Sequence, residues 1–193
     1  TLLDGDHLLY IIARNRQSKQ SMQGGVVGTV MSNLGLERAL EALAVPCARA
    51  QVGDRDIMQA LQQRGWTLGG EPSGHILTLD LCSTGDAIIA ALQVLLAMQQ
   101  ADTPLKDLAT SITQAPQVLI NVNVDSPAGV CEHPQMVEAQ TTYERQLGSR
   151  GRILIRASGT EPLLRIMVEG EDEAEVDQVA QSLAAQARVI HAA

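Results

Sequence analysis

Residues 152–170 read RILIRASGTEPLLRIMVEG, two apolar runs joined by a short loop of small and polar residues. The runs RILIRA and LLRIMVEG are typical of strands, and the turn-forming residues between them favour a hairpin. A third strand is predicted at QVLINVNV, and helices are predicted at about 133–147 and 172–189. Two consecutive strands flanked by helices indicate a small α+β domain with an antiparallel sheet.

Strands and helices alternate in the preceding part of the chain. Apolar residues recur at helical spacing in HLLYIIARNRQ, LGLERALEALA and RDIMQALQQRG, in a long apolar stretch that starts at Ser83 or Thr84, and in a short one that Pro104 opens. The runs GGVVGTVMSN, VPCARAQV, WTLGG and HILTLDL are typical of strands. This alternation predicts an α/β layered domain. We therefore expect two domains, at residues 1–114 and 117–193.

The composition limits the possible classes of function. The net charge is -8 and the chain has no Phe, one Trp and two Tyr, so the basic and stacking surfaces that nucleic acids need are not expected. Three widely spaced cysteines indicate neither a disulfide framework nor a zinc site, which favours a reduced, cytoplasmic location. No apolar run reaches the ~18 residues of a membrane span. The start at Thr1 predicts a fragment of a longer protein.

The loop of the predicted hairpin has the residue types of an anion site. Arg156 and Arg165 supply positive charge and planar donor groups that suit a phosphate. Ser158 and Thr160 add hydroxyl donors, and Gly159 lets backbone amides approach an anion closely. The alternative is a plain hairpin turn with surface arginines.

A second polar loop, EPSGH, lies between two predicted strands. Glu71, Ser73 and His75 place a carboxylate, a hydroxyl and an imidazole in one turn around Gly74, groups that hydrogen-bond sugar hydroxyls. An imidazole also accepts and donates protons near neutral pH, which makes His75 a candidate general acid or base. A turn with an exposed histidine explains the residues equally well.

Two further acidic motifs precede predicted helices. Gly53, Asp54 and Arg55 could present a basic residue at a helix start, although an N-cap followed by a surface arginine is the simpler interpretation. Asp4 and Asp6 in LDGD suggest a metal site, but a helix-capping role for Asp6 explains the pair adequately. We assign no metal ligand in this chain.

Five segments together carry a resemblance to a known family. They are LDGDHLLYIIA, GGVVGTVMSNLGLE, VGDR, GGEPSGHIL and RASGTEPLLRIMVEGED, in that order along the chain. The chain resembles the C-terminal half of bacterial phosphoglucosamine mutases, members of the α-D-phosphohexomutase superfamily, over essentially its whole length. The resemblance implies the third and fourth domains of that family.

The resemblance also implies an activity. It is the interconversion of glucosamine 6-phosphate and glucosamine 1-phosphate through a phosphoserine enzyme, Mg2+ and a bisphosphorylated intermediate. The serine and metal loops of the family lie upstream of the matching region, so this chain is expected to bind no cofactor and to be inactive alone. The implied partners are a phosphorylated amino sugar, the N-terminal domains of the same enzyme and, as one possibility, a second copy. A stand-alone phosphosugar-binding module and a phosphomannomutase or phosphoglucomutase portion are the alternatives.

By position, the resemblance assigns roles to two groups of residues. The first group, in the domain at 117–193, would hold the phosphate that is not transferred: Arg156, Ser158, Gly159, Thr160 and Arg165. The second, in the domain at 1–114, would bind the sugar or line its cleft: Gly53, Asp54, Arg55, Glu71, Ser73, Gly74 and His75.

Overall fold

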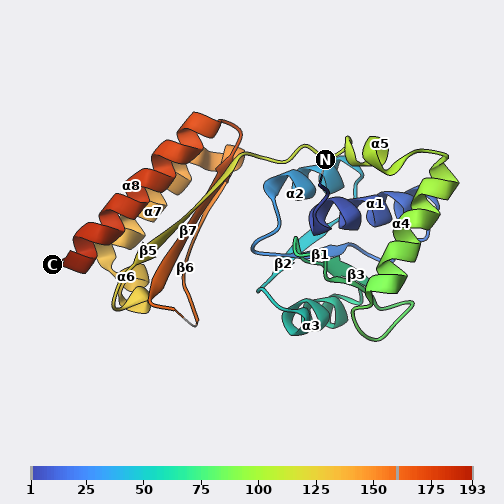
Figure 1. Ribbon diagram of the computed structural model, residues 1–193, viewed down its shortest axis with the longest axis horizontal. Coiled ribbons are helices and arrows are strands. Elements are labelled where there is room, and N and C mark those ends of the chain that lie inside the picture. The colour runs from blue at the N-terminus through green and yellow to red at the C-terminus, as the bar shows by residue number, and fades with distance from the viewer. Residues whose placement is uncertain (1, 160, 193) are drawn as a thin grey trace. The chain divides into compact units, whose positions relative to one another are not determined.

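The computed structural model describes residues 2–159 and 161–192. The chain divides into two compact units, residues 1–114 and residues 115–193 (Figure 1). Each unit has its own hydrophobic core, and each is described here by itself.

The N-terminal unit contains a four-stranded mixed sheet. Its order is β2 (Cys47–Ala50), β1 (Val26–Thr29), β3 (Leu68–Gly70) and β4 (Ile76–Thr78). Strand β1 pairs parallel with β2 and β3, and β4 pairs antiparallel with β3. Because β1, β2 and β3 are parallel, the loops that follow them leave the sheet at the same edge, which is where ligands bind in open α/β sheets.

Five helices accompany this sheet. They are α1 (Gly5–Ser18), α2 (Leu34–Ala42), α3 (Asp54–Arg64), α4 (Ala87–Ala101) and α5 (Leu105–Ala109). Their apolar residues pack against alternate residues of the strands, because successive strand side chains point to opposite faces. Val26 packs in the core with α1, α2, α4 and α5, whereas Val27 packs in a second cluster with α3. The predicted α/β layered domain is confirmed.

Three helix starts differ from the sequence predictions. Asp4, not Asp6, is the N-cap of α1, and its carboxylate accepts a hydrogen bond from the His7 backbone N–H at 3.1 Å. Helix α3 begins at Asp54 with no side-chain cap. Helix α4 begins after Asp86, later than Ser83 or Thr84, because the Asp86 carboxylate accepts hydrogen bonds from the backbone N–H groups of Ile88 and Ile89.

The C-terminal unit contains a three-stranded antiparallel sheet. Strand β7 (Leu163–Gly170) lies between β5 (Gln117–Asn123) and β6 (Gly151–Ala157). The predicted strands RILIRA and LLRIMVEG are therefore the neighbouring strands of a hairpin, and the predicted α+β domain is confirmed.

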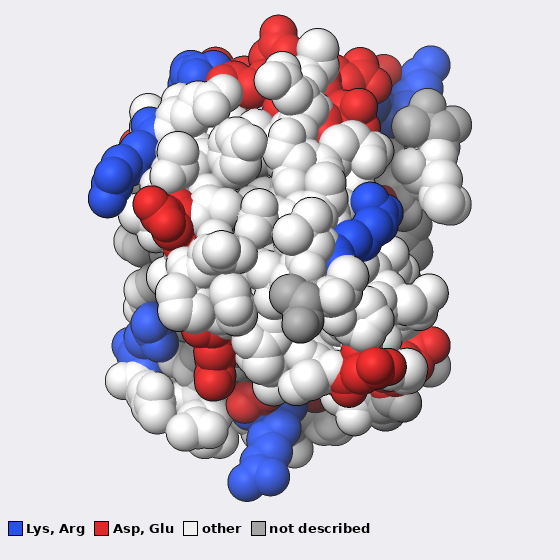
Figure 2. All heavy atoms as spheres, turned by 90° about the vertical axis from the view of Figure 1, so that its left-hand side faces the viewer, with Lys and Arg blue, Asp and Glu red and all other residues white. Residues whose placement is uncertain are grey.

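Helices pack on one face of this sheet. They are α6 (Pro127–Glu132), α7 (Pro134–Leu147) and α8 (Glu173–Ala192). The sequence predicted α7 and α8 but missed α6, a short helix that ends at Glu132. Figure 2 shows the unit from the side of the helices, where uncharged residues cover most of the centre. The charged side chains that this view shows lie mostly around the edge of the face.

No helix in the part of the chain that the structure describes is long and apolar enough to cross a membrane.

Candidate functional site

The loop between β3 and β4 forms a tight turn around a fixed carboxylate. The backbone N–H of Gly74 donates to the carbonyl of Glu71 at 3.0 Å, and Gly74 has a φ of 100°, a value that favours glycine. One Glu71 carboxylate oxygen accepts from the Gly53 N–H at 2.8 Å, and the other accepts from the Ser73 hydroxyl at 3.0 Å. Glu71 therefore connects the loop before α3 with the loop after β3.

Two more side chains lie at this carboxylate. His75 Nδ1 is 3.5 Å from a carboxylate oxygen of Asp54 and 4.0 Å from one of Glu71. The His75 side chain is 70% exposed, so its imidazole can contact a ligand. Asp54 lies at the start of α3, and Arg55, the next residue, is exposed. The structure thus brings together Gly53, Asp54, Glu71, Ser73 and His75, as expected if they form one site.

The start of α1 supports this loop, a role that the sequence analysis missed. The Gly5 N–H donates to the Pro72 carbonyl at 2.9 Å. A Cβ atom on Gly5 would lie 1.9 Å from the Glu71 carbonyl oxygen, so only glycine permits the approach. The glycine between Asp4 and Asp6 was the feature of the sequence that could have indicated this role. The sequence does not show, however, which distant backbone segment lies against that glycine.

Asp6 links α1 to the loop that follows β1. Its side chain is 1% exposed and accepts a hydrogen bond from the Asn33 N–H at 2.7 Å. Burial raises the pKa of this carboxyl group to about 6, although the Asn33 hydrogen bond acts in the opposite direction. The LDGD motif is therefore a structural support in which Asp4 caps α1 and Asp6 holds a neighbouring loop.

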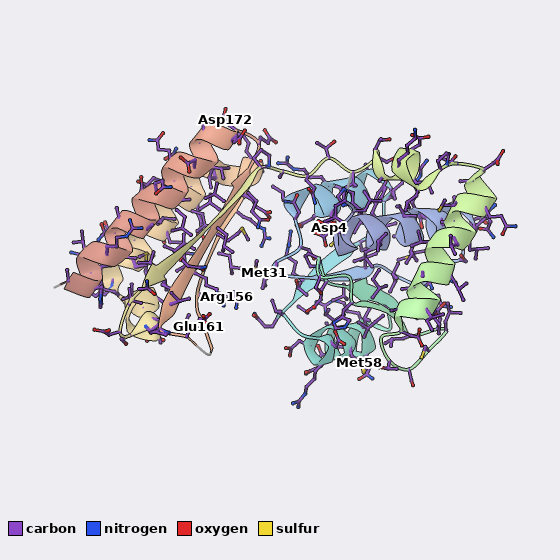
Figure 3. All side chains as sticks on the ribbon, in the orientation of Figure 1. Asp4, Met31, Met58, Arg156, Glu161 and Asp172 are labelled. Atoms are coloured by element: carbon purple, nitrogen blue, oxygen red, sulfur yellow. The ribbon has the colours of Figure 1, made fainter. Side chains whose placement is uncertain are left out.

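A side chain of β2, Arg49, also holds the loop that follows β1. Arg49 donates to the carbonyls of Thr29 at 3.0 Å and Ser32 at 2.6 Å, and it forms an ion pair with Glu37 at 2.8 Å. Met31, labelled in Figure 3, lies in this loop. Three loops that follow parallel strands are thus fixed by hydrogen bonds at the edge where a ligand is expected.

In the C-terminal unit, Arg156 and Arg165 are direct cross-strand partners in the pairing of β6 with β7. Their side chains therefore lie on the same face of the sheet. They are not on the face that packs on the helices, because the neighbouring residues Ile155 and Ile166 occupy that core. Figure 3 labels Arg156 at this end of the sheet. Two like charges opposite each other are unfavourable unless an anion or acid lies near.

One acid balances part of this charge. Glu161 lies 3.2 Å from an Arg165 terminal nitrogen, and the same guanidinium group lies 3.5 Å from the Ser158 hydroxyl. Arg165 Nε is buried and has no hydrogen-bond partner within the described residues. Within the described residues, two guanidinium groups and one paired acid, Glu161, leave a net positive charge, as an anion site requires.

The predictions for the other residues of this loop are taken one by one. A Cβ atom on Gly159 would meet nothing within 4 Å, so packing within the chain does not require glycine there. Thr160 lies outside the described residues. The sequence analysis did not single out Asn121, which pairs with Arg165 across β5 and β7 and adds an exposed amide to the same row.

Comparison with known proteins identifies the fold. N-acetylphosphoglucosamine mutase from Aspergillus fumigatus has a TM-score of 0.84 at 21% identity, over 99% of this chain and 44% of that chain. The same fungal enzyme in complex with GlcNAc-6P and magnesium has a TM-score of 0.74 at 21% identity, over 96% of this chain and 47% of that chain. The two units thus have the fold of α-D-phosphohexomutase domains.

Family models and a closer relative define the family. The model for phosphoglucomutase/phosphomannomutase, alpha/beta/alpha domain III, matches residues 4–115, and the model for the C-terminal domain matches residues 119–186. The chain belongs to the phosphoglucomutase/phosphomannomutase family. It is 52% identical over 183 residues to a phosphoglucosamine mutase of Pseudomonas paraeruginosa, covering 95% of this chain and 41% of that protein. The chain therefore spans less than half the length of this curated relative.

Proposed function

We propose that this chain is the substrate-binding portion of a phosphoglucosamine mutase, an isomerase that interconverts glucosamine 6-phosphate and glucosamine 1-phosphate. The name of the 52% identical relative supports the reaction. The observation that carries the proposal is the pair Arg156 and Arg165, which lie opposite each other with one acid, Glu161, to balance them.

The arginine pair would hold the phosphate that is not being transferred. A guanidinium group binds phosphate through two parallel hydrogen bonds, and the Arg165 side chain is 32% exposed, so it can reach a ligand. Ser158 supplies a hydroxyl beside Arg165, and Gly159 leaves room for the ligand to approach the backbone. Thr160 is proposed for the same role from its position in the motif.

The loop at Glu71 would bind the sugar. Its carboxylate accepts hydrogen bonds from sugar hydroxyls, and the contacts to Gly53 and Ser73 hold it in one orientation. Because Glu71, Asp54 and His75 converge, adjacent hydroxyls can be bound by neighbouring groups. His75 is the candidate general acid or base, since its exposed imidazole can exchange a proton with a hydroxyl.

The magnesium ion that the family uses does not fit this chain. Within the described residues, the group of side chains close enough to hold an ion is Asp54, Glu71 and His75. Mg2+ prefers oxygen ligands in octahedral geometry, and this group includes an imidazole. We therefore assign the metal and the phosphoserine to the preceding part of a longer protein.

The contribution of this chain to catalysis would be orientation. Interactions with the non-reacting phosphate and with hydroxyls supply binding energy that positions the reacting oxygen. A bisphosphorylated intermediate presents a phosphate at either end, so the arginine pair can hold one end while the other reacts. The chain alone would bind substrate without converting it.

The test is ligand binding to the 193-residue chain by calorimetry. We expect glucosamine 6-phosphate to bind more tightly than glucosamine, and Arg165→Ala to remove most of the difference. A charge-assisted contact contributes roughly 1.5–3 kcal/mol, which corresponds to one to two powers of ten in affinity. The matched control is Arg188→Ala, which removes an exposed arginine of α8. Equal binding by wild type and Arg165→Ala would refute the phosphate role.

The same experiment separates the alternatives. Tighter binding of mannose 6-phosphate or glucose 6-phosphate would favour a portion of a phosphomannomutase or phosphoglucomutase. A stand-alone binding module would bind the phosphosugar with high affinity and would occur in its organism without the preceding domains.

A further inference from the structure

We propose that Asp54, Glu71 and His75 form a binding site for a divalent transition-metal ion of the Zn2+ class, which would occupy the position of the sugar hydroxyls. One ligand atom from each residue lies within 4.8 Å of the other two. The sequence analysis considered a metal only at Asp4 and Asp6, and it did not connect Asp54, the first residue of α3, with Glu71 and His75 in the loop after β3.

The distances between the three ligand atoms are close to those between the ligands of a bound ion. Ligands about 2.1 Å from a tetrahedral Zn2+ are about 3.4 Å from one another. The separation of His75 Nδ1 from Asp54 is already 3.5 Å, and that from Glu71 is 4.0 Å. The side chains of Asp54 and His75 are 45% and 70% exposed, so they can make the small remaining movement.

Glu71 is the preorganised ligand of the three. Its side chain is 11% exposed, and the Gly53 N–H and the Ser73 hydroxyl each donate to one of its oxygens. Such outer hydrogen bonds orient a ligand before the metal binds. This loop therefore provides one fixed and two adjustable ligands, with the exposed side open for water or for a substrate group.

A second observation is that one carboxylate oxygen of Asp54 lacks a hydrogen-bond partner. Its Oδ1 atom is buried and has no hydrogen-bond partner, and this is the oxygen that faces His75 Nδ1. Within the described part of the chain, neither Asp54 nor Glu71 forms an ion pair with a lysine or arginine. Two carboxylates near each other without a cation favour binding of a divalent ion.

The ligand set selects the class of ion. Imidazole nitrogen suits Zn2+, Co2+ and Ni2+, whereas Mg2+ and Ca2+ prefer oxygen ligands alone. The site should therefore bind Zn2+ and Co2+ in the presence of excess Mg2+. If the proposed function is correct, the ion and the sugar hydroxyls need the same side chains, so micromolar Zn2+ would act as a competitor of phosphosugar binding.

The test uses metal-free 193-residue chain and two probes, Zn2+ by calorimetry and Co2+ by visible absorption. We expect one ion per chain, loss of binding in His75→Ala and Glu71→Gln, and roughly tenfold weaker binding in Ser73→Ala, which removes an outer hydrogen bond. His191→Ala is the matched control, because it removes an exposed histidine at the end of α8. A thermal melt of each variant verifies folding.

Two results would overturn the proposal. One is binding that persists in His75→Ala and Glu71→Gln. The other is binding that is lost in Cys82→Ser, which would place the ion on a thiol. Phosphosugar binding measured in metal-free buffer distinguishes this proposal from the proposed function, since either can fail while the other holds.

Discussion

Asp6 illustrates how one buried side chain couples stability to pH. Burial raises its pKa from 3.8 to about 6, so the folded chain keeps this proton over a pH range in which the unfolded chain has lost it. The resulting stabilisation is complete below the ordinary pKa and is lost as the pH rises through about 6. A shift of this size corresponds to about 3 kcal/mol in the free energy of unfolding.

Asp6→Asn tests this coupling. Because Asn cannot ionise, the variant should gain stability relative to wild type as the pH rises from about 4 to about 7. Unfolding followed by fluorescence of Trp66, the single tryptophan, reports on the N-terminal unit. Asp107→Asn, at an exposed position of the same unit, should show no such trend. A constant difference between Asp6→Asn and wild type across this range would contradict the assignment.

Arg156 shows the conflict between stability and binding at a single residue. It lies directly opposite Arg165, and like charges in this position destabilise a sheet by roughly 0.2–1 kcal/mol. Arg156→Ala should therefore leave the free energy of unfolding unchanged or slightly higher while weakening phosphosugar binding. Chemical denaturation and calorimetry on the same samples measure both quantities. A large loss of stability would mean that Arg156 serves the fold instead of the ligand.

At the scale of elements, α1 supports the loop at Glu71 through its first residue, whose N–H donates to the Pro72 carbonyl. Gly5→Ala would place a methyl group 1.9 Å from the Glu71 carbonyl oxygen, and backbone cannot move aside as easily as a side chain can. We expect a loss of about 3 kcal/mol or more in stability, together with weaker sugar binding. Gly85→Ala is the control, since its nearest contacts are an ordinary 3.7 Å. Equal melting of both variants would show that the contact of α1 with the loop is dispensable.

At the scale of the whole molecule, the prediction concerns activity. The chain covers 41% of the length of its Pseudomonas relative, and we assign the phosphoserine and Mg2+ to the remainder. Purified chain given glucosamine 6-phosphate, the bisphosphate primer and Mg2+ should show no turnover, while the Pseudomonas enzyme assayed in parallel serves as the positive control. Turnover above a no-protein blank, in a preparation free of host mutase, would contradict this division of roles.

Features that depend on near neighbours were predictable from the sequence. Successive apolar residues such as Val26 and Val27 pack in different clusters on the two faces of the sheet, so a continuous apolar run indicates a strand covered on both faces. The hairpin of β6 and β7 was also predictable from the sequence, because two strands joined by a short loop pair with each other. Arg156 and Arg165 are nine positions apart, and that local geometry places them opposite each other.

Helix starts were less predictable, because several residues near a boundary can act as caps. Asp4 and Asp6 are equally suitable by type, and packing decides between them: Asp6 is buried against the loop at Asn33, which leaves Asp4 to cap α1. Asp86 likewise takes the role predicted for Ser83 or Thr84. A capping preference is worth about 1 kcal/mol, which tertiary contacts easily exceed.

The sequence by itself determined the two fold classes, the family and the residue types of both loops, since these follow from local spacing and short motifs. Only the tertiary structure decided that Asp54 meets His75, that Glu71 accepts from Gly53, and that Gly5 lies against the Glu71 carbonyl. These residues are 18 to 66 positions apart. Contacts at such separations depend on how strands and helices pack, and no local pattern of residue types specifies which distant side chains will meet.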